Sequence, residues 1–490
     1  MSEQTQLPEK GEKHAHGHGH GGFHGPKCWV ISAIVGAALG LLLCRTFPPE
    51  YTAEGLPIIP LWLCAPFAML LASIALMPFV SMRFWHNHFP DFAFLLGAVV
   101  AAYYISGYTR PDAAGHAYGS HTMLHAIIEF YSFIALVGGL FVVSGGILVE
   151  VDKRSSRLGN LVLLAVGALL ANVVGTTGAS MLLIRPFMRM NTGRLRPTHV
   201  VFFIFIVSNC GGALTPIGDP PLYLGFLKGV PFFWTLSHLW PDWLAVVGAL
   251  LVIFAVYDYR VSASDEPAPA TGTGHVRFRG AHCLVCLALM VAGVFIDPIL
   301  KQRFGIEGIP VGATFQILVA AAAYALSRKE ILAANDFSFF PVKEVGLLFL
   351  GIFATMAPAL GYLAIHGSKL GISTPTAFYF ATGALSAVLD NAPTYLNFLQ
   401  VAFGDREINA ISIAEFLSSH DNARLLHAIS TGAVFFGAMT YIGNGPNFMV
   451  KAIAESAEVK MPGFFGYLGR ALAILLPVLV VNWFVFVLKH

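Results

Sequence analysis

The sequence predicts an all-α polytopic membrane protein of about 11 transmembrane helices plus two re-entrant hairpins, arranged in two inverted-topology repeats. Three observations lead to this prediction. Hydrophobic residues make up 56% of the 490-residue chain and charged residues only 11%, against roughly 45–50% and about 25% in soluble domains. Apolar runs long enough to cross a bilayer recur from end to end. A ten-residue motif that contains glycine, proline and threonine also recurs in similar form in the second half of the chain.

The N-terminal residues 1–27 are predicted to form a disordered cytoplasmic tail. They are polar and precede the first apolar run, which is not the order of a cleaved signal peptide. Histidines that alternate with glycine can chelate divalent metals, although incidental affinity is the simpler interpretation. The candidate metal ligands are His14, His16, His18 and His20.

The apolar runs divide into an extra first helix (28–55), a first repeat (56–257) and a second repeat (281–490). A polar stretch rich in Pro, Gly and Ser, residues 258–280, is predicted to be a cytoplasmic linker between the repeats. The eleven predicted spans lie near residues 28–45, 57–80, 91–107, 122–149, 198–225, 239–257, 281–297, 308–326, 343–365, 425–452 and 466–488.

Two more apolar segments, 158–190 and 374–403, are interrupted midway by polar residues and predict re-entrant hairpins. Irregular backbone at membrane depth is tolerated only where it is buried in protein or lines a cavity. Both hairpin tips are therefore expected at a functional interface.

The repeated motif supports a duplication. GALTPIGDPP at 212–221 aligns without gaps with GAMTYIGNGP at 437–446, and each copy lies within a predicted broken helix, 198–225 or 425–452. Each copy also follows a hairpin. Five crossings plus a hairpin per repeat would place the second repeat upside down, and carriers with such repeats bind their cargo at discontinuous helices near the midplane.

The distribution of Lys and Arg predicts the orientation. With the N-terminus inside, most of the 29 Lys and Arg residues fall on the cytoplasmic face, where such residues accumulate. The prediction is a multi-pass protein of the cell inner membrane, with a cytoplasmic N-terminus and an extracytoplasmic C-terminus. The formal net charge of +2, with scattered basic residues, does not indicate a nucleic-acid partner.

The helix breaks carry oxygen ligands suited to a hard cation. The side-chain oxygens come from Ser208, Asn209 and Thr215 in the first repeat and from Thr440, Asn444 and Asn447 in the second. Gly-Pro kinks that only assist helix packing are the simpler alternative.

Two carboxylates, Asp219 and Asp390, lie at the breaks. An ionisable residue inside a spanning segment is costly and indicates function, here alternate binding of a proton and a metal cation. Each aspartate could instead cap the N-terminus of a half-helix.

His121, His125 and Glu129 recur every four residues and share one helical face. They are candidates for a proton path, with Glu129 and His125 its principal members, or for a metal site. Ordinary interfacial histidines are the alternative.

Three motifs resemble those of the ion transporter superfamily: SNCGGALTPIGDPPL at 208–222, AVLDNAPT at 387–394 and TYIGNGPN at 440–447. The chain is most similar to NhaD-type sodium/proton antiporters and to proteins labelled as citrate transporters. The resemblance implies an elevator-type mechanism, often in a homodimer, with ion sites at the hairpin tips. It assigns ion or substrate binding to Asn172, Thr176, Thr177, Ser208, Asn209, Thr215, Gly218, Asp390, Asn391, Thr394, Thr440, Gly443 and Asn447.

The departures from the superfamily favour a cation over an anion. Sodium-coupled dicarboxylate carriers have Ser-Asn-Thr at both tips, whereas here the tips read Ala171-Asn172-Val173 and Asp390-Asn391-Ala392. A carboxylate at the second tip suits a cation and repels citrate.

The predicted function is therefore exchange of Na⁺ for H⁺ by a secondary transporter, not an enzyme, with Na⁺ as cargo and no cofactor. The alternatives are an H⁺- or Na⁺-coupled citrate or other carboxylate carrier and, more distantly, a membrane metalloenzyme that uses His121, His125 and Glu129.

Overall fold

A computed structural model describes residues 25–488, apart from residue 54 and residues 113–114, 152–156, 263–275, 307 and 407. It confirms the all-α membrane fold. Nine helices among the described residues are long and apolar enough to cross a membrane, and the described strands form two two-stranded sheets. The tail histidines His14, His16, His18 and His20 lie outside the described residues.

The chain before residue 263 folds mainly into helices, joined by short 3₁₀ segments (η) and strands. In chain order these elements are α1 (Pro26–Thr46), β1 (Glu50–Tyr51), β2 (Pro57–Ile58), η1 (Leu61–Cys64), α2 (Ala65–Gly107), α3 (Tyr118–Gly145), β3 (Leu148–Val151), α4 (Arg157–Met190), α5 (Pro197–Ile206), η2 (Cys210–Leu214), α6 (Pro220–Leu227) and α7 (Trp234–Ser262).

The described part of the chain from residue 276 onward is also mainly helical. Its elements are β4 (Val276–Arg279), α8 (Ala281–Gly293), α9 (Ile296–Phe304), α10 (Val311–Leu326), α11 (Lys329–Ala334), α12 (Phe340–His366), η3 (Gly367–Leu370), α13 (Pro375–Val388), α14 (Asn391–Phe403), α15 (Ala410–Ser418), α16 (His420–Phe436), η4 (Gly437–Met439), α17 (Gly445–Ser456), α18 (Phe464–Asn482) and the π-helical turn η5 (Trp483–Val487).

Helix α2 contains two of the predicted spans. A straight helix would separate Trp62 from Tyr103 by about 60 Å, at 1.5 Å per residue, yet their ring centroids lie 5.5 Å apart. The chain therefore doubles back, and the reversal occurs at Ser81, whose φ of −160° and ψ of 103° are not helical. The arms correspond to the spans predicted at 57–80 and 91–107.

Helix α1 packs on the second arm of α2 through two glycines. A Cβ on Gly36 or Gly40 would collide with the carbonyl of Leu95 or Val99 respectively. Small residues four apart let two membrane helices approach closely. Most other α1 side chains, including Val30, Ile31 and Ile34, are exposed, as expected for a helix that faces lipid.

The segment predicted as a linker is ordered at both ends. Helix α7 continues to Ser262, and β4 pairs with β3 in an antiparallel sheet in which Leu148 lies opposite Arg279. Both ends of the range predicted as a linker, 258–280, therefore belong to regular structure. The sequence gave no sign of the strand, because its partner β3 lies far away in the chain. Residues 263–275 lie outside the described chain.

Two pairs of apolar arms return on themselves. Asn160 and Asn191, at the two ends of α4, exchange hydrogen bonds of 2.9 Å, and the helix is interrupted at Gly175, where φ is +75°. Phe378 of α13 and Phe398 of α14 lie 6.3 Å apart between ring centroids, with the reversal at Leu389 and Asp390.

The difference between eleven predicted spans and nine long helices follows from how individual segments are counted. Helix α2 counts once although its chain turns back, and α4, predicted as a hairpin, counts as one long helix. The predicted helix at 425–452 is divided among α16, η4 and α17, while α10 has 16 residues.

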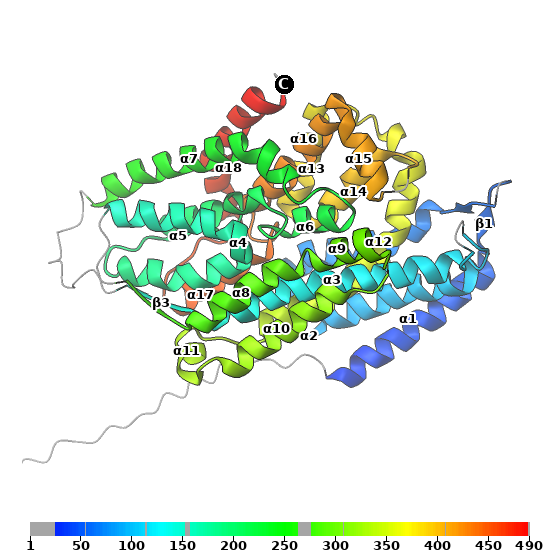
Figure 1. The fold of residues 1–490 in the computed structure, drawn as a ribbon, viewed down its shortest axis with the longest axis horizontal. Coiled ribbons are helices and arrows are strands. Elements are labelled where there is room, and N and C mark those ends of the chain that lie inside the picture. Colours follow the sequence, from blue (N-terminus) through cyan, green and yellow to red (C-terminus); the bar gives the residue numbers. More distant parts are fainter. Residues whose placement is uncertain are drawn as a thin grey trace, which may run out of the picture.

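The helices form two groups (Figure 1). Helices α1–α3 and α8–α12, here called the long-helix group, pack on one another in the lower part of the view, where α1, α2 and α3 run side by side. Helices α4–α7 and α13–α18 form the broken-helix group, in which α17 packs on α4 and α5 and α14 packs on α6. Segments from the two halves of the sequence thus meet in one core.

Candidate functional site

The first helix break lies between α5 and α6. Helix α5 ends at Ile206, and the chain passes through η2 and an irregular stretch before α6 begins at Pro220. Thr215 holds this stretch, because its hydroxyl donates to the carbonyl of Asn172 at 2.6 Å and accepts from the backbone N–H of Gly218 at 3.1 Å. The break is thereby tied to the tip of α4.

The second break, between α16 and α17, has the same contacts. The hydroxyl of Thr440 donates to the carbonyl of Ala387 at 2.5 Å and accepts from the N–H of Gly443 at 3.2 Å. Thr440 occupies the motif position of Thr215, and Gly443 that of Gly218. The two copies of the sequence motif therefore have equivalent local structures.

The side chain of Asn172 also links the tip of α4 to the first break. Its Oδ1 accepts from the N–H of Leu214 at 2.8 Å, and its Nδ2 donates to the carbonyls of Ala168 and Gly211 at 3.0 and 2.7 Å. All of these bonds are buried, so the amide serves to join α4 to η2. Its side chain has little remaining capacity to bind an ion.

Asp219 lies where the two breaks and the two tips meet. Its side chain is buried, and Oδ1 accepts from Thr176 Oγ1 and Asn444 Nδ2, each at 2.9 Å. Oδ2 accepts from Asn391 Nδ2 at 2.7 Å. These donors come from the tip of α4, from the start of α14 and from the second break. Although Asp219 stands at the N-cap position of α6, its side chain makes no cap bond.

The three described side chains that donate hydrogen bonds to this carboxylate are neutral. Among the residues that the structure describes, no Lys, Arg or His forms an ion pair with Asp219. A carboxylate removed from water is strongly disfavoured as an unbalanced anion. A proton or a bound cation is the natural means of neutralising it.

Asp390 is placed differently. It is partly exposed, and its side chain accepts from the N–H of Ala392 at 3.0 Å, which caps α14. The capping contact considered from the sequence is thus formed at Asp390 and not at Asp219. Thr394, one turn further on, donates to the backbone carbonyl of Asp390 at 2.8 Å.

Two buried amide oxygens near Asp219 accept no hydrogen bond from the described residues, Asn209 Oδ1 and Asn391 Oδ1. The Nδ2 of Asn209 donates to Asn447 Oδ1 at 2.6 Å, which joins the two broken helices. A Cβ built on Gly437 would lie 3.2 Å from Asn391 Nδ2, 3.3 Å from the Gly443 carbonyl oxygen and 3.4 Å from Asn209 Oδ1. Asn209 Oδ1, the Gly443 carbonyl oxygen and the Asn391 amide therefore lie around one point beside Gly437, between the breaks.

The remaining predicted site residues surround this centre or lie beside it. Asn447 also donates to the carbonyls of Gly437 and Thr440, each at 2.8 Å. Ser208 shares a hydrogen bond of 2.7 Å with Ser180 and does not reach Asp219. Thr177 lines a small pocket with Thr176, Asp219 and apolar side chains of α3, including Leu136 and Leu140.

Glu129 and His125 do not join the site. Glu129 forms an ion pair of 2.5 Å with Lys228, at the C-terminal end of α6, and both side chains are about one-fifth exposed. His125 contacts His121, at 3.0 Å between their Nε2 atoms. The two proposed members of a proton path therefore have separate partners.

Two further buried aspartates were not singled out from the sequence. Asp242 of α7 binds His427 Nε2 at 2.8 Å and Asn482 Nδ2 at 2.9 Å. Near the far end of α7, Asp258 binds His199 Nε2 at 3.1 Å. Asp242 could have been recognised as a lone charge in an apolar span, but its partners are 185 and 240 residues away in the sequence.

Spanning helices that are interrupted where two halves of the chain meet, around a buried carboxylate, define a membrane transport protein. The chain belongs to the family described as "Putative citrate transport", whose model matches residues 57–487. This match confirms the predicted resemblance to citrate-transporter-like members of the ion transporter superfamily.

Two curated relatives agree with this class. They are uncharacterized transporters of Mycobacterium bovis and Mycobacterium tuberculosis. Each is 25% identical to the chain over 322 residues, which cover 62% of this chain and 71% of the relative. The protein is a multi-pass membrane transporter.

Proposed function

We propose that the protein exchanges Na⁺ for H⁺ and that Asp219 carries the two ions in turn. The observation that supports this most strongly is the buried carboxylate of Asp219, bonded to three neutral donors and to no basic side chain of the described chain. Proton and Na⁺ each neutralise the carboxylate. Because the site becomes an unbalanced anion when empty, it favours exchange of one cation for the other over release without replacement.

The neighbouring oxygens are suited to complete a shell for Na⁺. Asn209 Oδ1 and Asn391 Oδ1 are buried without a donor among the described residues, and Asn209 Oδ1 and the Gly443 carbonyl oxygen lie close to the same point beside Gly437. A half-turn of the Asn391 amide would replace its Nδ2, now on Asp219, with Oδ1. That orientation is unfavourable beside a carboxylate unless a cation lies between the two oxygens.

The proposal includes the duplicated architecture and an elevator-type movement. The equivalent contacts of Thr215 and Thr440 support two related repeats. The broken-helix group would move against the long-helix group and carry the site with it, in a homodimer of the inner membrane. The N-terminus would be cytoplasmic and the C-terminus extracytoplasmic.

A carboxylate carrier is the second candidate, since the family description names citrate. A carrier of that kind would have to place hydroxyl or basic donors against an anion. The carboxylate of Asp219 and the two free amide oxygens instead favour a cation at the centre.

Proteoliposomes with an internal pH dye test the proposal. Adding Na⁺ outside should alkalinise the lumen as protons leave, and Asp219→Asn should abolish the signal. Asp405→Asn, at an exposed loop position, is the matched control and should retain wild-type rates. Uptake of labelled citrate with no pH response to Na⁺ or Li⁺ would contradict Na⁺/H⁺ exchange and favour the carboxylate carrier.

A further inference from the structure

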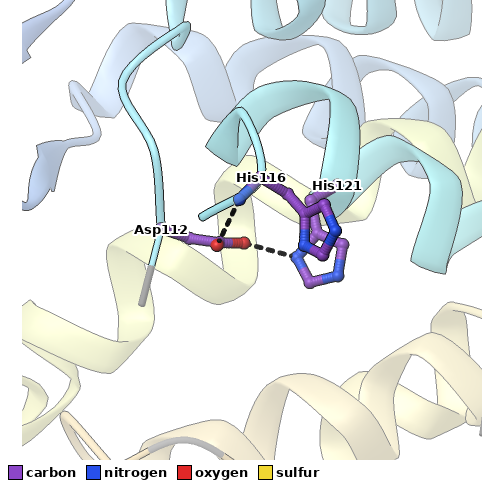
Figure 2. A group of neighbouring side chains, drawn as sticks. All are labelled: Asp112, His116 and His121. Carbon is purple, nitrogen blue, oxygen red and sulfur yellow. Dashed lines mark hydrogen bonds and ion pairs between the residues drawn. The ribbon is translucent and has the colours of Figure 1, made fainter. Parts of the chain in front are cut away.

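A cluster of three potential metal ligands lies far from Asp219 in the fold, where the chain passes from α2 to α3. Asp112 and His116 belong to the connecting loop, and His121 belongs to the first turn of α3 (Figure 2). Their carboxylate oxygen and imidazole nitrogens all lie within 4.8 Å of one another. Figure 2 shows both imidazole rings on the same side of the Asp112 carboxylate.

Backbone hydrogen bonds join the described parts of the loop on either side of residues 113–114. Asp112 N–H donates to the His116 carbonyl at 2.8 Å, and Tyr118 N–H donates to the Arg110 carbonyl at 3.0 Å, so the two ends of the loop are paired. The N–H of His116 also donates to Asp112 Oδ1 at 3.0 Å. One carboxylate oxygen is therefore held by the loop, and Oδ2 points towards the histidines.

His121 is bonded through both ring nitrogens. Nδ1 lies 2.6 Å from Asp112 Oδ2, and Nε2 lies 3.0 Å from His125 Nε2. The ring of His116 stacks on that of His121, at 5.1 Å between centroids. A metal-binding histidine usually donates its second N–H to another group, which fixes its ring orientation. His125 is placed to accept that hydrogen bond.

We propose that Asp112, His116 and His121 bind a divalent transition-metal ion such as Zn²⁺, with His125 as a positioning residue. Two imidazole nitrogens and one carboxylate oxygen are a suitable ligand set for zinc, which takes water in its fourth position. His116 is exposed and Asp112 partly exposed, so the ion can enter from water.

Small side-chain rotations would bring the ligands into place. Zinc–ligand bonds of about 2.0–2.1 Å in a tetrahedron separate the ligand atoms by roughly 3.3 Å. The Asp112–His121 contact must open slightly and the His116 ring must approach. The ion would then hold the α2–α3 loop to the first turn of α3. Glu129, which the sequence grouped with His121 and His125, is committed to Lys228 and takes no part.

The test uses full-length protein in which His14, His16, His18, His20 and His24 are replaced by Asn, so that tail histidines do not compete. Titration with Zn²⁺ by calorimetry and with Co²⁺ by visible absorption should give one site per chain, with Co²⁺ bands typical of nitrogen and oxygen ligands. His116→Gln and Asp112→Asn should each weaken Zn²⁺ binding by at least about tenfold, and His125→Gln by about tenfold.

The control is His366→Gln, whose ring bonds to the carbonyl of Tyr362 and should not affect Zn²⁺ affinity. His116 lies on an exposed loop, so its substitution should leave elution volume and thermal unfolding unchanged. Absence of a stoichiometric Zn²⁺ or Co²⁺ site in the background protein would overturn the proposal. Equal affinity in the His116→Gln, Asp112→Asn and control proteins would overturn it as well.

Discussion

At the residue scale, the structure separates two aspartates that the sequence treated alike. Asp219 accepts three side-chain hydrogen bonds at the meeting point of both breaks, whereas Asp390 accepts one backbone N–H and caps α14. A cap tolerates Asn almost as well as Asp, because an amide oxygen can accept the same bond. A cation-binding carboxylate does not tolerate this change.

Asp390→Asn therefore tests the second aspartate. If Asp390 acts as a cap, the variant should keep the thermal stability of the wild type and exchange Na⁺ for H⁺ within a few-fold of the wild-type rate. Asp390→Ala should lower the free energy of unfolding by about 1 kcal/mol. Loss of exchange in a folded Asp390→Asn protein would restore Asp390 to the ion site, as the sequence comparison predicted.

At the element scale, the two broken helices depend on one threonine each. The hydroxyls of Thr215 and Thr440 join the breaks to Asn172 and Ala387, respectively, in the α4 and α13–α14 segments. Without the hydroxyl, a buried carbonyl and an N–H are left without a partner. The free-energy penalty of these unsatisfied groups is larger than the net stabilisation that a hydrogen bond provides. Loss of either threonine hydroxyl should therefore lower the free energy of unfolding more than loss of an average surface hydroxyl.

Thr440→Val should lower the free energy of unfolding by about 1–3 kcal/mol, measured by denaturant titration in detergent. Thr215→Val should act in the same direction, with a smaller effect because Thr215 is partly exposed. Thr440→Ser retains the hydroxyl and should stay close to the wild type. Equal stability of the Val and Ser variants would show that this contact does not hold the break.

The ion pair between Glu129 of α3 and Lys228, the residue directly after α6, connects the two helix groups. If the pair only links the groups, Glu129→Gln and Lys228→Met should change the exchange rate to a similar extent. The double variant Glu129→Lys with Lys228→Glu should then recover the wild-type rate. A proton path through Glu129 predicts a different pattern. In that case Glu129→Gln abolishes Na⁺/H⁺ exchange, and the double variant with reversed charges does not restore it.

At the scale of the whole molecule, the predicted cytoplasmic segments gather at one end. Asn335, after α11, donates to the carbonyls of Gly145 and Ile147, and Arg185 pairs with Asp336 at 3.2 Å. Strands β3 and β4 pair beside them. Tyr51 and Arg110 meet at the other end, in segments predicted to be extracytoplasmic. The loops assigned to the two sides of the membrane therefore separate to opposite ends of the helices, whichever end faces the cytoplasm.

Single cysteines introduced into a variant without its six native cysteines would measure this orientation. With the N-terminus inside, a membrane-impermeant maleimide added to whole cells should label Thr52→Cys, in the β1–β2 hairpin. It should label Arg328→Cys, before α11, only after the cells are opened. The reverse pattern would show that the orientation is inverted, while both proteins should run alike on size-exclusion chromatography.

Features that depend on residues close together in the chain could be predicted from the sequence alone. Apolar runs predicted the spanning segments, because each must satisfy its backbone within the bilayer. Repetition of GALTPIGDPP as GAMTYIGNGP predicts both breaks, and the polar residues at the breaks and hairpin tips include Asp219, Asn391 and Asn444. Local glycine, proline and polar side chains were sufficient signals for these features.

Which of these residues contact one another depends on how distant segments pack, and it could not be predicted from the sequence. Asn391 and Asn444 reach Asp219 across 172 and 225 residues of sequence, and the role of Asp390 as a cap depends on the start of α14. The β3–β4 pairing and the Glu129–Lys228 ion pair also went unpredicted. Each depends on packing between distant segments, and one sequence carries no local signal for which partner a buried polar group will find.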